Sequence, residues 1–484
     1  MVYSLQIPRE KWSKFTGWYE DILINAEIYD HRYPLKGAGV WMPYGFLLRE
    51  KVYNFLRDLE RKNNYYEVLF PTLIPEDLFI KEAEHVASFE KEVFWVTKGG
   101  GKELQKKYVL RPTSETAMYP MFALWAKSYK DLPIKIFQIV NVFRYETKAT
   151  HPLYREREVT TFFESHCAFA TAEENESEVM LAIDMYKEFF DWLGIPYLIT
   201  QRPEWDKFPG AEYTIAFDTI MPNGRTLQIG TVHNLGQNFS KAFEIIVDLP
   251  DGSRDYVYQN CFGVSGRVIT ALIAVHGDDH GLVLPPNVSP IDVVIVPIIY
   301  KEYEENIVKE AKEVSKILKD NGYNVVLDLS EETPGSKFYK WELKGVPIRI
   351  EIGPKDVEEA TLTLVRRDTL EKIIIKKDEL LENLKLLQRA IYENLKTRAK
   401  DFFNSKIKEA NNLDEVKTLI DEGFVVKVDW CGDESCGLDI EEKVGYKLLG
   451  MVLEDKKKFE KPKNMKCINC GKEAKYRLAI SKSY

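Results

Sequence analysis

The sequence predicts an α+β protein built from more than one domain, and three observations support this prediction. The 484 residues exceed what one ordinary hydrophobic core holds. Strand-like segments dominate the first part of the chain, without a regular strand–helix–strand alternation. A regular alternation begins near residue 286, and four of the six cysteines lie near the C-terminus. We therefore expect domains at residues 1–285, 286–400 and 401–484.

The first of these domains combines an amphipathic helix at residues 46–64 with several strands. Five apolar residues share one face of this helix: Leu48, Val52, Phe55, Leu56 and Leu59. Residues 65–75 read as a strand interrupted by Pro71, which places it at a sheet edge or an interface. Further strand-like segments predict a large antiparallel sheet: residues 134–146, 155–169, 213–221, 226–236 and 255–266.

The second domain shows a β-α-β-α-β pattern, which predicts a compact three-layer α/β unit. The strands are expected at residues 291–299, 323–329 and 346–353. The helices are expected at residues 301–322, ending at Gly322, and at 334–345. A long helical stretch at residues 378–410 then leads to the cysteine-bearing tail.

Composition limits the function classes. The net charge of −9 argues against a generally basic nucleic-acid binder, so any such contact must come from local patches. No apolar run reaches the length of a membrane span, and the N-terminus lacks the apolar core of a secretory signal. Few cysteines in so long a chain favour a reducing compartment. We expect a cytoplasmic protein that does not contact a membrane.

Several arginines stand among the predicted strands. Arg144 ends one strand, and Arg155 and Arg157 open the next after a polar turn. Because a guanidinium is a permanently charged planar fork that pairs with phosphate, this strand–loop–strand unit could cradle a triphosphate. Salt bridges on a solvated face are the alternative.

A second feature favours the phosphate interpretation. Residues 261–279 read as a strand, a glycine-rich turn and an apolar helix that begins at Arg267. Gly263, Ser265 and Gly266 permit a close ligand approach, and the exposed N–H groups at a helix start favour anions. Alone this pattern is weak, but it gains weight beside the arginine-bearing strands.

In this order the three segments resemble the class II aminoacyl-tRNA synthetases. Residues 39–75 are similar to their first motif, a dimer-interface helix and strand ending in a proline, here Pro71. Residues 143–166 are similar to the second motif, and residues 263–272 to the third. Within the class, residues 110–119 and 230–243 most resemble prolyl-tRNA synthetases of the archaeal/eukaryotic type. The resemblance covers essentially the whole chain. It implies a class II antiparallel-sheet catalytic domain, an anticodon-binding α/β domain and a C-terminal zinc-binding α+β domain in a homodimer.

This resemblance implies individual roles in ATP-dependent ligation of L-proline to tRNA(Pro) through a prolyl-adenylate. Arg144 would bind the α-phosphate of ATP and the substrate carboxylate, and Arg267 would bind the γ-phosphate, which makes them the expected catalytic residues. Fixed arginines and Mg²⁺ suit the chemistry because the attacking carboxylate is already an anion. Five further residues would complete the ATP site: Glu146, Arg155, Gln228, Thr231 and Ser265.

A proline site can also be argued from chemistry. Prolinium offers two N–H donors, a carboxylate and a small apolar ring. Thr113 and Glu115 could accept from the amine, and Arg144 could bind the carboxylate. The walls are expected from Phe162, Phe163, His166 and His233, although a lone histidine more often fills a core. Because such a pocket rejects small apolar side chains poorly, we expect misactivation of alanine or cysteine. Only 97 residues separate His166 from Gly263, and strands occupy them, so no editing domain is expected there.

The tail carries two cysteine pairs, and their spacing predicts a closed structural Zn²⁺ site. The ligands would be Cys431, Cys436, Cys467 and Cys470. We expect Cys431→Ser to destabilise the tail with little direct effect on adenylation. The lysine-rich residues 454–466 fit a solvated face as well as an RNA contact. By resemblance, Tyr484 matches a C-terminal tyrosine whose carboxylate approaches the active site.

The resemblance places anticodon contacts in residues 341–356. The candidates are Glu342, Lys344 and Arg349, since splayed bases are read by hydrogen bonds. Ordinary helix-surface and strand-edge charges are the alternative for each of them.

Two other functions stay open at this point. A threonine enzyme would need an active-site zinc, for which Cys167, His233 and Cys261 lie in the right half. However, Cys167 follows His166 on a strand, so the two side chains point to opposite faces. A non-catalytic relative would be expected to have lost some phosphate-binding residues, yet Arg144 and Arg267 are both present.

Overall fold

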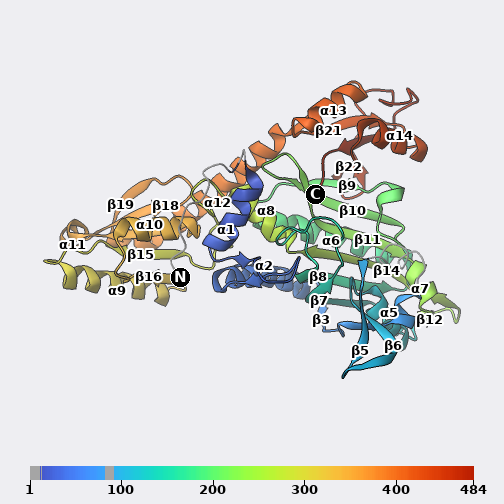
Figure 1. The fold of residues 1–484 in the computed structure, drawn as a ribbon, viewed down its shortest axis with the longest axis horizontal. Coiled ribbons are helices and arrows are strands. Elements are labelled where there is room, and N and C mark those ends of the chain that lie inside the picture. The colour runs from blue at the N-terminus through green and yellow to red at the C-terminus, as the bar shows by residue number, and fades with distance from the viewer. Residues whose placement is uncertain (1–10, 12–13, 82–91) are drawn as a thin grey trace.

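The fold centres on one large sheet that runs through the first part of the chain and continues into the last part (Figure 1). The structure, a computed structural model, describes residue 11 and residues 14–81 and 92–484. Most of the N-terminal segment examined for a secretory signal therefore lies outside the described residues. Within these residues, no helix has the length and apolar character needed to cross a membrane.

The central strands of this sheet are antiparallel, as predicted. Their order is β9-β10-β11-β14-β8-β7, with β3 added at the edge. The bounds are β3 Tyr66–Glu67, β7 Ile134–Phe143, β8 Glu158–Phe169, β9 Leu198–Gln201, β10 Tyr213–Ile220, β11 Thr226–Gly236 and β14 Tyr258–Ser265.

Helices cover one face of this sheet and leave the other face for the site. The covering helices are α1 Phe15–Asn25, α2 Pro43–Lys62, α6 Ala172–Trp192 and α8 Arg267–His276. Inward-facing strand residues such as Phe163, Phe217 and Phe262 share one apolar core with them. The predicted face of α2 is confirmed, since Leu48, Val52, Leu56 and Leu59 are buried.

The segment around Pro71 forms two short strands and not one. β3 is the edge strand of the large sheet and pairs parallel with β7, whereas β4 (Leu73–Pro75) pairs with β6 in a small separate sheet. Because Pro71 has no backbone N–H to donate to a neighbouring strand, the chain leaves the first sheet at this residue. The expected edge position is confirmed, but the continuous strand is wrong.

Smaller elements surround the open face of the sheet. Residues 255–266, predicted as one strand, divide into β13 and β14. The remaining elements of the first part are β1 Tyr29–Asp30, β2 Val40–Trp41, α3 Glu76–Phe79, β5 Phe94–Gly99, β6 Lys102–Leu110, α5 Glu115–Trp125, α7 Asn238–Ala242, β12 Ile246–Asp248 and β13 Arg254–Tyr256.

The second domain has the predicted three layers. Three parallel strands, β16-β15-β17, are followed by two antiparallel strands that the sequence reading did not include, β18 and β19. Val293 and Ile295 on β15 contact the core formed with α9 and α12, whereas Val294 and Val296 contact Trp341 of α10 on the other face. The bounds are β15 Val293–Pro297, α9 Glu304–Asp320, β16 Val325–Leu327, α10 Pro334–Leu343, β17 Ile348–Ile352, α11 Pro354–Glu359, β18 Thr361–Arg366, β19 Lys372–Lys376 and α12 Leu380–Ser405.

The C-terminal part adds its strands to the central sheet. β22 pairs with β9 through Met451 opposite Gln201 and Val452 opposite Thr200. Backbones approach closely there, because a Cβ on Gly450 would lie 2.2 Å from the Gln201 carbonyl oxygen. The elements are β20 Ile407–Glu409, α13 Leu413–Asp421, β21 Val425–Trp430, α14 Glu434–Val444, β22 Leu448–Asp455, β23 Lys458–Phe459 and β24 Tyr476–Ile480. The tail is thus joined to the central sheet as well as to the long helix α12.

Candidate functional site: a phosphate- and amine-binding cavity

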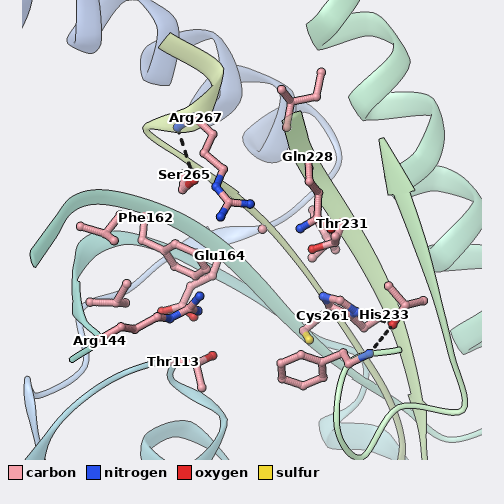
Figure 2. Close-up of a pocket in the computed structure, with 18 of the residues that line it drawn as sticks. Thr113, Arg144, Phe162, Glu164, Gln228, Thr231, His233, Cys261, Ser265 and Arg267 are labelled. Carbon is pink, nitrogen blue, oxygen red and sulfur yellow. Dashed lines mark hydrogen bonds between the residues drawn. The ribbon is translucent and has the colours of Figure 1, made fainter. Parts of the chain in front are cut away.

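A cavity of about 320 Å³ opens on the uncovered face of the sheet. It has the size of a small-molecule site. Twelve of the thirteen residues predicted for ATP and proline line it: Thr113, Glu115, Arg144, Glu146, Arg155, Phe162, His166, Gln228, Thr231, His233, Ser265 and Arg267. Segments far apart in the sequence therefore converge as expected, and Figure 2 shows Arg144, Arg267 and Gln228 extending into this space from different segments of the chain.

Three guanidinium groups give one end of the cavity a concentrated positive charge. Arg267 is the first residue of α8; its Nε donates to the Tyr154 carbonyl at 3.0 Å. Burial and then the charges of Arg144 and Arg155 lower the pKa of Arg267 to about 10. Arg144 donates from Nε to the Pro112 carbonyl at 3.1 Å, and its guanidinium lies over Phe162. Such mutual repulsion is relieved by an anion that carries several charges, such as a triphosphate.

A β-bulge brings Gln228 and Thr231 to the same face of β11. Residues three apart on a regular strand point to opposite faces. Here Phe217 pairs with Gly230 but the next residue, Asp218, pairs with Gln228, so Ile229 is the extra residue. Ile229 turns into the apolar core, while Gln228 and Thr231 both line the cavity (Figure 2).

The other end of the cavity is polar and acidic. Thr113 Oγ1 donates to Glu115 Oε2 at 2.5 Å, and the Cys261 thiol lies 3.6 Å from Glu115 Oε1. Glu115 is only 2% exposed, so both of its oxygens are held in the protein interior beside the cavity. A carboxylate held in this way is suited to an ammonium ligand.

Two histidines flank this acidic end, and their pKa values are shifted in opposite directions. His166 Nε2 lies 3.3 Å from Glu164 Oε2, and its Nδ1 lies 3.1 Å from the Tyr119 hydroxyl. Burial opposes the charged form, but the hydrogen bond to Glu164 and the charges of Glu115 and Glu164 outweigh it, so the pKa of His166 is raised. Burial and the charge of His166 lower the pKa of His233 to about 3, which keeps that ring neutral.

Strand alternation on β8 decides which of its side chains reach the cavity. Phe162, Glu164 and His166 line it, whereas Phe163 and Cys167 belong to the apolar core. The prediction that Phe163 forms a pocket wall is therefore wrong. Glu164 was overlooked, although the same alternation could have identified it from its neighbours.

The three metal ligands considered for a threonine enzyme, Cys167, His233 and Cys261, do not form a cluster in the structure. Cys167 faces Tyr65 on the opposite side of the sheet. Among the described residues, the ligand atoms that cluster here within 4.8 Å belong to Glu115, His166 and Cys261 instead. Because both ring nitrogens of His166 already contact Tyr119 and Glu164, this cluster reads as a hydrogen-bonded polar pocket end.

Comparison with known proteins then identifies the family. The family model described as tRNA synthetase class II core domain (G, H, P, S and T) matches residues 94–276. The proline--tRNA ligase of Methanothermobacter thermautotrophicus is 51% identical over 97% of this chain and 96% of its own length. That of Metallosphaera sedula is 52% identical over 99% of this chain and 100% of its own.

The chain belongs to the prolyl-tRNA synthetase family.

Solved structures of prolyl-tRNA synthetases share the whole fold. The Giardia lamblia enzyme in complex with prolyl-adenylate superposes with a TM-score of 0.94 at 35% identity, covering 100% of both chains. The Cryptosporidium parvum enzyme complexed with L-proline and AMP has a TM-score of 0.92 at 33% identity, covering 100% of this chain and 98% of that one. The class II fold predicted from the sequence is confirmed.

A second family model, described as Anticodon binding domain, matches residues 292–387. In this chain the three anticodon candidates are all engaged in ion pairs. Arg349 is largely buried; its guanidinium donates to Glu342 at 2.7 Å and to Glu351 at 2.9 Å. Lys344 Nζ lies 2.6 Å from Glu27 in the first domain.

The third family model, Prolyl-tRNA synthetase, C-terminal, matches residues 413–484. The sulfur pairs Cys436–Cys467 and Cys431–Cys470 are each 3.6 Å apart, and all four ligand atoms lie within 4.8 Å of one another. A disulfide would require about 2.0 Å. A zinc tetrahedron with Zn–S bonds of about 2.3 Å has edges of about 3.8 Å, so the arrangement fits Zn²⁺.

Two further features of the C-terminal part can be placed. The Tyr484 ring contacts Tyr154 at 5.0 Å between centroids, beside the cavity. Four lysines of the lysine-rich segment form ion pairs with acidic side chains: Lys456 with Asp184, Lys457 with Glu176, Lys458 with Glu454 and Lys463 with Glu409.

Proposed function

We propose that this chain ligates proline to tRNA(Pro) in two steps at the cavity. In the first step a proline carboxylate oxygen attacks the α-phosphorus of ATP, the bond to the β,γ-diphosphate breaks, and prolyl-adenylate and pyrophosphate form. In the second step a hydroxyl of the tRNA terminal adenosine attacks the prolyl carbonyl, and AMP leaves. The observation that carries the proposal is the convergence of Arg144, Arg155 and Arg267 beside the acid-ended pocket.

The catalytic roles go to Arg144 and Arg267. Arg144 lies between the two ends of the cavity, over Phe162, where it can hold the proline carboxylate against the α-phosphate. Arg267 at the start of α8 would hold the γ-phosphate, where the helix dipole adds to its charge. The first step requires no general base because its nucleophile, the proline carboxylate, is already ionised; in the second step the hydroxyl proton can pass to the departing AMP phosphate. The supporting ATP contacts are assigned to Glu146, Arg155, Gln228, Thr231 and Ser265.

The acidic end would bind the proline amine. Thr113 and Glu115 would accept from its two N–H groups, and Phe162 would cover the ring. The bond to Glu164 raises the pKa of His166, whereas the lowered pKa of His233 makes that ring a neutral wall. We propose that this small pocket also activates alanine or cysteine weakly, because an apolar pocket gains little from one or two extra methylenes.

Mg²⁺ would arrive with ATP. Among the described residues, the clusters of three or more potential ligands contain sulfur or imidazole, whereas Mg²⁺ prefers oxygen donors and retains water. The chain therefore offers no oxygen cage of its own in that part, and Glu146 at the cavity wall is the carboxylate best placed to approach the phosphates. When bound, the ion would neutralise charge on phosphate oxygens.

We propose that no separate editing domain exists between the second and third motifs. The elements α6, β9, β10 and β11 occupy most of that interval and belong to the catalytic sheet or its cover, and the stretch between β11 and β14 holds α7 and the short β12–β13 pair. Residues 286–400 would bind the anticodon through Glu342, Lys344 and Arg349, and residues 401–484 would hold structural Zn²⁺ through the four cysteines.

A homodimer is proposed from exposed apolar side chains near the first motif. Tyr66 is 72% exposed and Leu69 is 80% exposed, with Leu73 nearby on β4. Isolated exposed apolar residues are common, but a cluster at a sheet edge favours an interface. Sedimentation velocity would show a dimer mass, and Leu69→Glu would shift it towards monomer.

Charging of a tRNA(Pro) transcript with labelled proline and ATP tests the function. Formation of an ester-linked prolyl-tRNA supports the proposal. Activation without transfer would retain the first step and contradict the second.

A further inference from the structure

We propose that Arg202 is a positioning residue through which the C-terminal domain orients Gln228 in the ATP site. The inference rests on the proposed function of that site. Arg202 follows β9, is only 7% exposed and lines the cavity. Arg202 was not among the residues predicted to bind ATP, and it lies outside the C-terminal domain. Its side chain nevertheless contacts Gln228 of the ATP site and Leu449 of the C-terminal domain.

The guanidinium of Arg202 bridges the two regions by direct hydrogen bonds. Nη2 donates to Gln228 Oε1 at 3.0 Å and to Asp218 Oδ1 at 3.0 Å. Nη1 donates to the Leu449 carbonyl at 2.5 Å, on β22 of the C-terminal domain. Backbone pairing fixes its own position, since Arg202 N donates to the Thr214 carbonyl at 2.8 Å.

These contacts determine how Gln228 presents its side chain. A guanidinium has donors only, so it selects the amide oxygen of Gln228 and directs the NH₂ group away from itself. Gln228 therefore acts as a donor towards the cavity, where acceptor atoms of a nucleotide, such as phosphate, hydroxyl or ring nitrogen, would be bound. Without Arg202 the amide could rotate and present its oxygen to the same acceptor, which would repel it.

The position of the Leu449 carbonyl depends on how the C-terminal domain docks. Thr200 Oγ1 also donates to this carbonyl, at 3.0 Å. The adjacent Gly450 has φ +123 and lies against the Gln201 carbonyl, so the β22–β9 pairing allows no side chain there. A displaced β22 would leave two buried donors without their acceptor, which costs more than the loss of an exposed bond.

It follows that the tail contributes to nucleotide binding and not only to stability. The expectation that Cys431→Ser has little direct effect on adenylation then needs revision. Damage to the cysteine cluster or to the β22 docking should weaken ATP binding while proline binding at the other end of the cavity is retained.

Steady-state ATP–pyrophosphate exchange tests the proposal with Arg202→Met in the full chain. We expect the KM for ATP to rise at least tenfold, the KM for proline to stay within twofold, and Arg202→Lys to fall between, because lysine cannot bridge both acceptors. Arg254→Met serves as the control, since Arg254 is exposed and pairs only with Asp248 among the contacts shown. Wild-type chain without exchange would defeat the proposed function itself, whereas unchanged or equally raised KM values in Arg202→Met would defeat only this inference.

A second variant separates positioning from general stability. Gly450→Ala should raise the KM for ATP by displacing Leu449, and the double variant with Arg202→Met should be no worse than the more affected single variant. If the rise in the KM for ATP of the double variant equals the product of the two single rises, the two residues act independently and the inference is contradicted. Thermal unfolding of each variant, measured in parallel, identifies those that are folded at the assay temperature.

Discussion

Glu164 and His166 form a buried pair on the floor of the cavity, with Oε2 and Nε2 3.3 Å apart. Burial alone would raise the pKa of Glu164, but hydrogen bonds from His166, Ser114 and Gln138 hold it below its ordinary value. The same pairing raises the pKa of His166. The pairing therefore favours an ionised Glu164 and a protonated His166 beside the proposed amine site.

This pair should give stability a defined pH window. The lowered pKa of Glu164 contributes stability above its unfolded-state value of 4.5 and loses it as pH falls through the folded value. The raised pKa of His166 contributes fully below 6.5 and loses it as pH rises through the folded value. We expect the wild-type chain to have a larger free energy of unfolding than the Glu164→Gln variant, and this difference should be largest between pH 4.5 and 6.5.

Urea unfolding across pH 4 to 9 measures that difference. Glu188→Gln is the matched control, because Glu188 is exposed on α6 and should show a flat difference. A difference for Glu164→Gln that does not decrease above pH 6.5 would show that His166 is not charged by its neighbour.

Arg144 should be indispensable for activation. Arg144→Ala is expected to lower kcat/KM for proline-dependent pyrophosphate exchange by about 10²–10³-fold, the usual cost of one donor aimed at developing phosphate charge. Arg144→Lys should recover only part of the lost kcat/KM, since lysine lacks the planar guanidinium that can donate two parallel hydrogen bonds. Exchange that survives Arg144→Ala undiminished would remove Arg144 from the site.

The anticodon residues should affect charging but not activation. Arg349→Lys keeps the charge of the buried group but loses the fork that joins Glu342 and Glu351. We expect kcat/KM for tRNA(Pro) to fall about 10-fold or more, in the range of one lost base contact. Pyrophosphate exchange should stay within twofold.

Arg389→Lys on the exposed side of α12 is the control for that experiment. If Arg349→Lys charges tRNA as wild type does, the ion pairs of Arg349 are structural and the anticodon is read elsewhere.

One zinc ion per chain is expected from elemental analysis. Cys431→Ser should remove it and lower the melting temperature, because a structural zinc site contributes directly to folding. Cys167→Ser should retain the metal, since Cys167 lies in the apolar core away from both clusters. A second zinc that persists after loss of the cysteine cluster would indicate binding by Glu115, His166 and Cys261.

Much of this architecture could be predicted from local sequence pattern. Alternation on β8 placed His166 and Cys167 on opposite faces, and Pro71 marked an edge. These inferences succeeded because strand period and proline chemistry are local properties. The failure at Phe163 came from not applying the same period consistently.

Other features depend on tertiary register and could not be predicted in this way. The bulge at Ile229 brings Gln228 and Thr231 together, and nothing in the single sequence marks it. The pairing of β22 with β9 joins residues more than 240 positions apart, as does the contact of Arg202 with Leu449. From the sequence, only the resemblance at Tyr484 pointed to an approach of the C-terminal domain to the site.

The most direct test is ATP–pyrophosphate exchange measured separately with each of the twenty amino acids. The structure predicts the highest kcat/KM with proline, weaker exchange with alanine or cysteine, and little with the others. Faster exchange with another amino acid would contradict the assignment of Thr113, Glu115 and His166 to proline. No exchange with any amino acid, in folded protein with Mg²⁺, would contradict the catalytic function.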